Sequence, residues 1–382
     1  MAKSILVLED GTCFEGEGFG AQTDSVFELV FNTSMTGYQE ILTDSSYRGQ
    51  GVLFTVSHMG NVGINLEDYE ASAPQISALV VCDLSSVVSN WRAKVSLDDW
   101  LKQYGIPGIM GVNTRAITHL IRNGGTVKAG LSTSGTTVAD LLTKIRAWEG
   151  LDGIDMVKEV TCRNWYAWEG DAADAWVIKD VVPQKKINFP NPPTIVVVDY
   201  GVKRNMIRHL AAWGAQVVVV PATYTAEQIF KFMPDGILLS NGPGDPAGLP
   251  YAVQTVSHLL HHEKPIFGIC LGHQLLGRAL GAETKRLKFG HHGGNHPVYD
   301  IHNKNVLITA QNHNFVVDMT SMQTNQVVAT HYSLNDQSLE GMRVPDRRIF
   351  SVQFHPEAAP GPHDAHGLFL SFFQSILEVM QL

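Results

Sequence analysis

Cys270 stands where a cysteine can act as a nucleophile. Residues 265–269 form a short apolar run typical of a buried strand, and a helical pattern follows from Leu271 onward. Gly268 and Gly272 flank the cysteine in a Gly-x-Cys-x-Gly pattern. A tight turn from strand to helix strains the backbone at its centre, and small neighbours remove the clashes that such a turn creates. The segment therefore predicts a nucleophile elbow in which sulfur is the attacking atom.

The helix expected after Cys270 adds electrostatic support to that sulfur. The first N–H groups of a helix have no partner within it, and the positive end of the helix dipole favours a thiolate over a thiol. The same N–H groups can stabilise a tetrahedral oxyanion. This chemistry predicts hydrolysis of a small amide through a covalent thioester.

A base and an orienting carboxylate follow farther along the chain. Residues 349–352 are strand-like, and His355 and Glu357 come shortly after them. Open α/β sheets place their active sites at the carboxyl edge of the strands, where His355 is expected to lie. A thiolate nucleophile needs a group that moves the leaving group's proton, and that group needs an orienting partner. We predict that His355 is this acid and base, and that Glu357 orients it.

Two other segments invite a chemical interpretation. Residues 242–246, Gly-Pro-Gly-Asp-Pro, follow a predicted strand and are either a plain turn or a loop whose backbone approaches a substrate; the elbow favours the second. His291, His292 and His296 are considered as metal ligands. However, adjacent residues point to opposite faces of an extended chain, and no cysteine or carboxylate joins the histidines at ligand spacing. No metal site is predicted.

The composition excludes several classes of protein. A chain of 382 residues exceeds the usual size of one hydrophobic core, so two domains are expected. A net charge of -9 with scattered lysines and arginines excludes a nucleic-acid partner. No window approaches the roughly 20 apolar residues that span a bilayer, so no membrane partner is expected.

The cysteines point to a reducing compartment. The four cysteines have no paired spacing that would indicate a disulfide framework or a zinc site. We therefore expect a cytoplasmic protein. Cys13, Cys82 and Cys162 are predicted to be core residues, because a lone cysteine is among the most buried residue types.

The first part of the chain is rich in short strands. Between residues 4 and 81, runs such as 26–31 alternate in polarity and are separated by Gly, Asn, Thr and Ser clusters. Ser96 begins a capping pattern for one helix, and residues 138–148 have the period of another. We predict a smaller, β-rich α+β domain over residues 1–150.

A change of pattern marks the second domain. Four prolines lie between residues 183 and 193 and cannot continue a helix or a central strand, so residues 151–193 are predicted to be a connecting segment and linker. From residue 194 onward, apolar runs alternate with helical patterns, which is typical of a parallel sheet flanked by helices. Residues 194–382 therefore predict a doubly wound α/β domain with a mostly parallel sheet.

Three segments, 242–246, 268–274 and 353–357, resemble in order and spacing the class I (triad) glutamine amidotransferases. The resemblance extends over essentially all of residues 194–382. It implies that Cys270 is the nucleophile, with His355 as acid and base and Glu357 as its orienting partner. The substrate would be the side-chain amide of L-glutamine, and the products glutamate and ammonia.

The N-terminal domain is similar to that of the small subunit of carbamoyl phosphate synthetase. The similarity rests on residues 31–40 and 58–63, and it continues in residues 290–297 and 311–315. Other triad amidotransferases lack such a domain. The resemblance implies that the glycine- and histidine-rich run at 290–297 is a structural loop.

The same resemblance implies a heterodimer with a large synthetase subunit. That partner would bind bicarbonate, ATP and Mg²⁺, receive ammonia through a channel, and make carbamoyl phosphate for arginine and pyrimidine biosynthesis. This chain contains no Gly-x-x-x-x-Gly-Lys phosphate loop, so we expect it to bind no cofactor itself.

Carried over residue by residue, the resemblance also implies a set of glutamine contacts from both domains. They are Ser46, Gly242, Gly244, Leu271, Gln274, Asn312, Asn314 and Phe315. Three positions depart from the family pattern, with Asn314 in place of a common glycine, Ser45 in place of proline and Asn113 in place of aspartate. Because asparagine tolerates a left-handed backbone, Asn314 is expected to preserve the shape of its loop.

Three alternatives remain open at this point. A stand-alone cysteine hydrolase would also use an elbow and a histidine, but it leaves Gln274 and the N-terminal domain without a role. A non-catalytic subunit would use the fold as an interface, although all three triad residues are present. An amidotransferase subunit of another pathway, such as anthranilate or guanylate synthesis, is disfavoured by the first domain.

Overall fold

The computed structural model describes residues 3–170, 191–322 and 327–380. The chain divides into two compact units, the first made of residues 1–154 and 287–293 and the second of residues 155–286 and 294–382. The predicted boundaries at 150 and 194 stay a prediction, and most of the predicted linker lies outside the described residues. The grouping of residues 287–293 with the first unit was not predicted.

The first unit contains a closed barrel of short strands. In the described part of this unit the strands are β1 (Lys3–Leu8), β2 (Cys13–Gly20), β3 (Asp24–Asn32), β4 (Gln50–Phe54), β5 (Ala78–Val80), β6 (Pro107–Met110) and β7 (Val127–Ser132). Their order around the barrel is β1-β2-β6-β5-β4-β3-β7. Strands β3, β4, β5 and β6 pair in parallel, whereas the remaining pairs are antiparallel. Closure leaves no sheet edge exposed.

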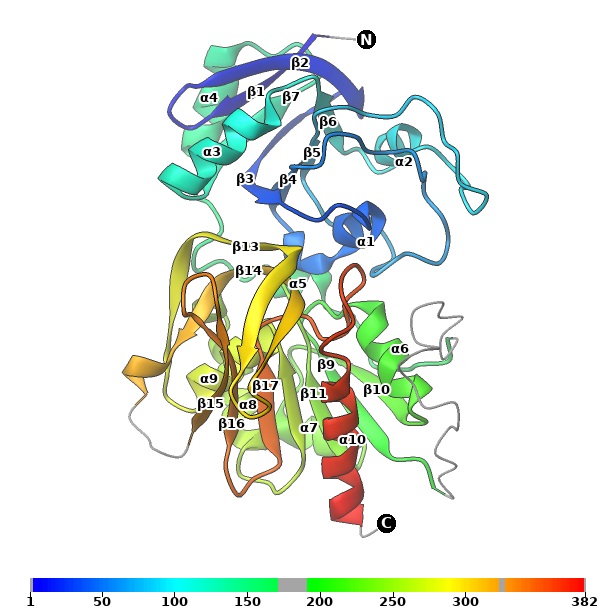
Figure 1. Cartoon of the computed structure of the whole chain (residues 1–382), viewed down its shortest axis with the longest axis vertical. Helices are drawn as coiled ribbons and strands as arrows, with labels where there is room; N and C mark the ends of the chain where they lie inside the picture. Colours follow the sequence, from blue (N-terminus) through cyan, green and yellow to red (C-terminus); the bar gives the residue numbers. More distant parts are fainter. Residues whose placement is uncertain (1–2, 171–190, 323–326, 381–382) are drawn as a thin grey trace. The chain divides into compact units, whose positions relative to one another are not determined.

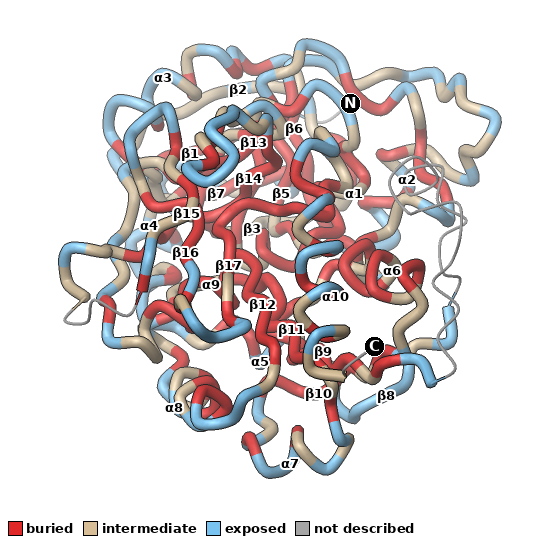
Figure 2. The backbone as a smooth tube through the Cα atoms, turned by 60° about the horizontal axis from the view of Figure 1, so that its bottom comes forward, coloured by how far each residue is buried: buried red, intermediate tan, exposed pale blue. Residues whose placement is uncertain are grey.

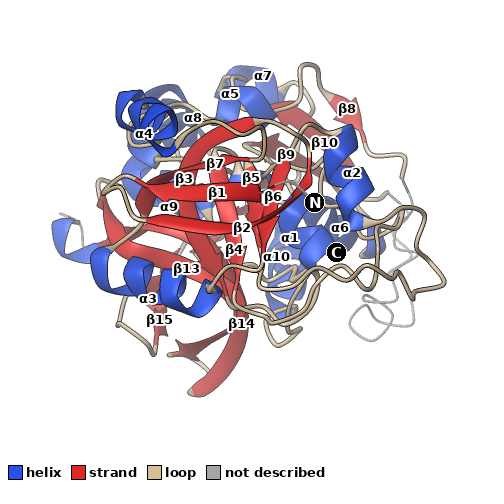
Figure 3. Cartoon of the chain, turned by 90° about the horizontal axis from the view of Figure 1, so that it is seen from above, coloured by secondary structure: helices blue, strands red, loops and turns tan. Residues whose placement is uncertain are grey.

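Short helices accompany this barrel. They are α1 (Tyr38–Thr43), the 3-10 helix η1 (Ser45–Tyr47), α2 (Leu97–Gln103), α3 (Thr114–Gly124) and α4 (Val138–Ala147). Helices α3 and α4 lie outside the strands in Figure 3. The predicted cap of α2 is confirmed, because the Ser96 side chain accepts the N–H of Asp99 at 3.1 Å. The helix expected over residues 138–148 is α4.

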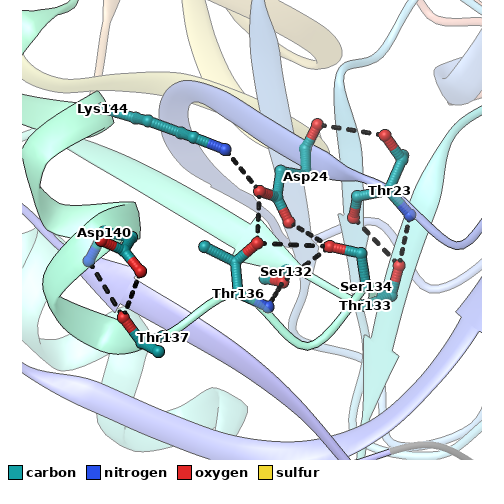
Figure 4. A network of polar contacts seen from close by, with 9 residues as sticks. All are labelled: Thr23, Asp24, Ser132, Thr133, Ser134, Thr136, Thr137, Asp140 and Lys144. Carbon is teal, nitrogen blue, oxygen red and sulfur yellow. Dashed lines mark hydrogen bonds and ion pairs between the residues drawn. The ribbon is translucent and has the colours of Figure 1, made fainter.

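A polar cluster fastens α4 to the barrel (Figure 4). The carboxylate of Asp24, on β3, accepts hydrogen bonds from Ser134 at 2.7 Å, Thr136 at 2.7 Å and the ammonium of Lys144 on α4 at 2.6 Å. Burial opposes ionisation, but these donors together hold the pKa of Asp24 well below its usual range. Three segments of the first unit are therefore joined at one carboxylate.

The second unit is built on one large sheet. Its strands in the described residues are β8 (Tyr166–Ala167), β9 (Thr194–Asp199), β10 (Gln216–Pro221), β11 (Gly236–Leu239), β12 (Ile266–Ile269), β13 (Glu283–Asp300), β14 (Asn305–Asp318), β15 (Val328–Ser333), β16 (Leu339–Val344) and β17 (Ile349–Val352). The order is β14-β13-β15-β16-β17-β12-β11-β9-β10-β8, and the neighbours from β17 to β10 pair in parallel. The fold class and the parallel central strands are confirmed. The sheet as a whole is mixed and not mostly parallel, because β8 pairs antiparallel with β10, and the pairs β13-β15, β15-β16 and β16-β17 are also antiparallel.

Helices cover both faces of this sheet (Figure 1). They are α5 (Val157–Val160), α6 (Arg204–Ala212), α7 (Ala226–Phe230), the 3-10 helix η2 (Pro246–Gly248), α8 (Pro250–Leu259), α9 (Leu271–Ala279), the 3-10 helix η3 (Met319–Ser321) and α10 (Gly367–Met380). Alternate residues of β9 enter two cores, one shared with α6 and α10 and the other with α7, α8 and α9. The central strands are mostly buried in Figure 2.

The structure corrects the predictions for one segment and for three cysteines. The run at 290–297 is part of strand β13 and not a loop, because β13 is hydrogen-bonded in the sheet between β14 and β15. Cys82 is exposed, and Cys13 and Cys162 are only partly buried, so the core prediction for these cysteines is wrong. Within the described residues, no helix is both long enough and apolar enough to cross a bilayer.

Candidate active site

Cys270 occupies a strained turn between β12 and α9. Its backbone has φ 54° and ψ -106°, a conformation that non-glycine residues rarely adopt. A Cβ atom at Gly268 would lie 2.9 Å from the Gly272 carbonyl oxygen, and one at Gly272 would lie 2.1 Å from the Leu239 carbonyl oxygen. The turn therefore requires glycine on both sides of the cysteine, which confirms the predicted elbow geometry.

The sulfur of Cys270 lies in a buried environment at the start of α9. The Cys270 residue is 1% exposed, and its Sγ lies 3.6 Å from the Asn312 carbonyl oxygen. Leu271 is the first residue of the helix, and no described residue accepts a hydrogen bond from its N–H. An uncommitted N–H beside the nucleophile suits an oxyanion that forms on a substrate carbonyl.

His355 and Glu357 form the second part of the site. The ring Nδ1 of His355 lies 2.7 Å from Glu357 Oε1, and both residues are buried. The backbone N–H of His355 donates to the Ala310 carbonyl of β14 at 2.9 Å, which fixes the histidine at the edge of the sheet.

The electrostatics of this pair favour an imidazolium beside a carboxylate. Burial lowers the pKa of His355, but the charge of Glu357, the nearby Cys270 and the hydrogen bond to Glu357 outweigh burial and raise that pKa above its usual range. Burial acts to raise the pKa of Glu357, and the charges of Lys203 and His355 reverse this and lower it. A protonated His355 next to Cys270 has a proton to give to a leaving group.

Two residues that the sequence reasoning missed hold Glu357 in place. Lys203, which is 3% exposed, lies with its Nζ 2.9 Å from Glu357 Oε1, and it also donates to the carbonyl of Ala358. The Asn205 side chain donates to the Glu357 carbonyl at 2.6 Å. Both follow strand β9 at the beginning of α6, so the polar run that follows this apolar strand was the available signal.

The glycine-rich loop at 242–246 packs closely against the elbow. A Cβ atom at Gly242 would lie 2.2 Å from the Tyr200 carbonyl oxygen and 2.8 Å from a side-chain carbon of Leu271. Gly244 has φ 88°, in the left-handed region that glycine tolerates. The loop thus brings its backbone next to the first residue of α9, as expected of a loop that approaches the substrate.

The remaining predicted contacts in the second unit lie around β14. Asn312, Asn314 and Phe315 are residues of this strand. The Gln274 side-chain nitrogen donates to the Phe315 carbonyl at 2.7 Å and to Gln353 Oε1 at 3.1 Å. No described residue donates to Gln274 Oε1, which leaves this oxygen available to a ligand.

The structure also places the three departures and Ser46. Asn314 lies within β14 without a positive φ, so the expected left-handed backbone is wrong. Asn113 caps α3 by accepting the Ala116 N–H at 3.0 Å, a role that aspartate also fills. Ser45 and Ser46 belong to η1 of the first unit, where the Ser46 N–H donates to Asp44 at 2.9 Å.

Comparison with known proteins gives the class to which this fold and site belong. The model of the class-I glutamine amidotransferases matches residues 196–375, which include the elbow and His355 with Glu357. A second model, the carbamoyl-phosphate synthase small chain domain, matches residues 6–131. The two matches place an amidotransferase domain and a small-chain domain in one polypeptide.

Full-length relatives identify the family. A carbamoyl phosphate synthase small chain from Nostoc sp. is 47% identical over 378 residues, covering 99% of this chain and 96% of that protein. The protein of the same name from Salmonella typhimurium is 48% identical over 383 residues, covering 100% of this chain and 99% of its own length. Among solved structures, a glutamine amidotransferase from Thermotoga maritima is 18% identical, covers 50% of this chain and 86% of its own, and has a TM-score of 0.36. The chain belongs to the carbamoyl phosphate synthase small chain family, as predicted.

Proposed function

We propose that the chain hydrolyses the side-chain amide of L-glutamine at Cys270 and supplies the ammonia to a large synthetase subunit that makes carbamoyl phosphate. The observation that carries this proposal is the strained, buried Cys270 at a helix start, together with a His355 whose ring is held by Glu357. Family membership supports glutamine as the amide, because the second unit matches the glutamine amidotransferase model.

The reaction follows from the positions of these groups. The Cys270 sulfur attacks the amide carbon, and the developing oxyanion is stabilised by the Leu271 N–H and the dipole of α9. His355 gives its proton to the leaving nitrogen, the C–N bond breaks, and ammonia leaves a glutamyl thioester. Neutral His355 then takes a proton from water as the water attacks the thioester, which releases glutamate and regenerates the thiolate and imidazolium.

The glutamine contacts are part of the proposal. In the second unit they are backbone groups of Gly242, Gly244 and Leu271 and side chains or backbone of Gln274, Asn312, Asn314 and Phe315. The free Gln274 Oε1 supports one of these contacts, because a ligand ammonium or amide N–H can donate to it. Ser46 of the first unit completes the proposed set.

The partner and the other substrates are proposed from the same reasoning. A small chain implies a large chain, and ATP, Mg²⁺ and bicarbonate are assigned to that large synthetase subunit, since the present sequence has no phosphate loop. The product would enter arginine and pyrimidine biosynthesis. A cytoplasmic location belongs to this proposal, because Cys270 must remain a reduced thiol to act as a nucleophile.

Ammonia release from glutamine tests the proposed function. The full chain and its Cys270→Ser variant are assayed with and without the cognate large subunit, bicarbonate and ATP. We expect release that depends on Cys270 and rises when ATP is added together with the large subunit. Release that is equal in Cys270→Ser would contradict the mechanism, and hydrolysis of esters or peptides in preference to glutamine would favour a stand-alone hydrolase.

A further inference from the structure

A closed circuit of buried polar groups lies along β14. It contains three glutamines, one histidine and one carboxylate, all at most 5% exposed. Its members are Gln274, Gln311, His313, Glu340 and Gln353. A buried polar group destabilises the fold unless it is hydrogen-bonded. A buried circuit of five polar side chains therefore suggests a role beyond packing.

The orientation of Gln311 is fixed by Glu340. The Gln311 side-chain nitrogen donates to Glu340 Oε2 at 2.9 Å and to Thr309 Oγ1 at 3.2 Å. With its amide nitrogen donating to Glu340, the Gln311 side chain directs its amide oxygen away from the carboxyl group. That oxygen lies 2.8 Å from His313 Nε2.

The His313 ring connects the Gln311 side chain to the backbone of β14. Its Nδ1 lies 3.0 Å from the Phe315 carbonyl oxygen, so both ring nitrogens lie at hydrogen-bond distance from a carbonyl oxygen. The Nε2 atom of His313 also lies 4.0 Å from Glu340 Oε1. Glu340 thus contacts Gln311 directly and lies beside the His313 ring.

The circuit closes at Gln274 on the nucleophile's helix. The Phe315 carbonyl oxygen that lies near His313 also accepts a hydrogen bond from Gln274 Nε2 at 2.7 Å. Gln274 Nε2 donates a second hydrogen bond to Gln353 Oε1 at 3.1 Å. The backbone N–H of Gln353 donates a hydrogen bond to the Glu340 carbonyl at 2.9 Å, which closes the circuit. Helix α9 and strand β14 are therefore joined through one carbonyl oxygen, with Glu340 at the far end.

The strand places the proposed substrate contacts next to this circuit. Residues Gln311 and His313 alternate with Asn312 and Asn314 along β14, so the two pairs point to opposite faces. The Asn312 carbonyl lies 3.6 Å from the Cys270 sulfur. A shift of Gln311 or His313 moves Asn312 through the shared backbone.

We infer that Glu340 is a positioning residue for the glutamine site: through Gln311 and His313 it fixes the Phe315 carbonyl and Gln274, and so sets the Asn312–Phe315 segment against Cys270. This inference rests on the proposed function. Because the circuit holds groups that contact glutamine and not the triad itself, removing its anchor affects substrate binding more than the chemical steps.

Steady-state ammonia release by the full chain with its large subunit tests this inference, using Glu340→Leu, Gln311→Leu and the double variant. Leucine cannot accept from Gln311, so we expect the KM for glutamine to rise roughly 10-fold in each single variant, with kcat within about 2-fold. Both substitutions break the same chain of contacts. The KM of the double variant should therefore equal that of each single variant, and the two increases in KM should not multiply. Glu340→Gln retains an acceptor for Gln311 and should keep KM within about 3-fold of the wild type.

Controls separate positioning from general destabilisation. Glu378→Leu removes a carboxylate from the exposed surface of α10 and should leave KM unchanged. An unchanged KM in Glu340→Leu or Gln311→Leu, or a product of the two effects in the double variant, would overturn the inference. If Glu340→Leu does not fold, an unchanged KM in Gln311→Leu overturns it alone. A wild-type chain that releases no ammonia would instead refute the proposed function.

Discussion

Glu357 in the second unit and Asp24 in the first are two carboxylates that are each paired with a lysine, yet their surroundings differ. The side chains of Glu357 and Lys203 are 0% and 4% exposed, whereas those of Asp24 and Lys144 are 16% and 53% exposed. Hydrogen bonds and charges lower the pKa of both carboxyl groups. A lowered carboxyl pKa therefore does not distinguish the two regions.

The other residues around Asp24 and Glu357 distinguish the two regions. Asp24 is surrounded by hydroxyl groups that keep their protons near neutral pH, so its cluster can only fasten α4 to the barrel (Figure 4). Glu357 faces His355, a group that gains and loses a proton, and Cys270 is close enough to His355 to influence the pKa of the ring. A titratable partner beside a nucleophile therefore marks the site, and not the perturbed carboxylate alone.

The sharpest way to test this comparison is to neutralise each carboxylate. Glu357→Gln removes the charge that orients and stabilises imidazolium His355, so kcat for ammonia release should fall by about 10²- to 10⁴-fold. Asp24→Asn should leave kcat and KM within about 2-fold of the wild type. Steady-state assays with the large subunit measure both; comparable losses in the two variants would show that the clusters do not differ in role.

Substituting Lys203 and Lys144 should give the next largest difference between the two regions, in the free energy of unfolding. Lys203→Met leaves Glu357 buried without its cation, which should reduce the free energy of unfolding by about 3–5 kcal/mol. Lys144→Met removes an exposed partner and should reduce it by less than about 1 kcal/mol. Denaturant unfolding of both variants measures the contrast. Equal and small losses would mean that Lys203 is not needed to hold Glu357.

The pH dependence of stability should also separate the two regions. Burial lowers the pKa of His209 and of His273 to about 3 each, with neighbouring histidines adding to the effect. These neutral side chains gain protons on unfolding, so stability should fall by about 1.4 kcal/mol per pH unit per histidine as the pH drops below about 6.5. The contribution of Asp24 is instead present above pH about 4 and lost only as the pH falls through its low folded pKa.

His209→Leu isolates the histidine effect. This variant should show a shallower loss of stability between pH 6.5 and 4.5, measured by denaturant unfolding at each pH. The exposed His119 on α3 offers a matched control, because His119→Leu should leave the slope unchanged. An unaltered slope in His209→Leu would contradict the assignment of His209 as a neutral buried group.

The smallest expected effect concerns the stability of the barrel. Asp24→Asn weakens three hydrogen bonds at a partly exposed position, so the free energy of unfolding should decrease by only about 1 kcal/mol. Thermal unfolding of Asp24→Asn beside Lys144→Met measures this. Losses that add fully in the double variant would argue against a shared cluster.

The elements that the sequence predicted well are those with local causes. The apolar run before Cys270 and its flanking glycines predicted the elbow, because the turn's steric demands fall on adjacent residues. The cap of α2 and the buried strand β9 were predictable for the same reason. Each pattern lies within a few residues of the structure it specifies.

The missed features depend on contacts between distant residues. Lys203 contacts Glu357, which lies more than 150 residues away in the sequence. No local sequence pattern predicts that this lysine is buried. The closed barrel depends on pairings such as β2 with β6, so the sequence supported only a β-rich domain. The family resemblance implied a loop at 290–297, whereas strand pairing in the sheet decides the structure of this run.

The most direct test of the central claim is detection of the covalent intermediate. The full chain with its large subunit is mixed with glutamine, quenched rapidly in acid, digested and examined by mass spectrometry. We predict a glutamyl adduct on the peptide that contains Cys270, reduced or absent in His355→Asn. Continued ammonia release with no adduct on that peptide, or with the adduct on another cysteine, would contradict the assignment of Cys270 as the nucleophile.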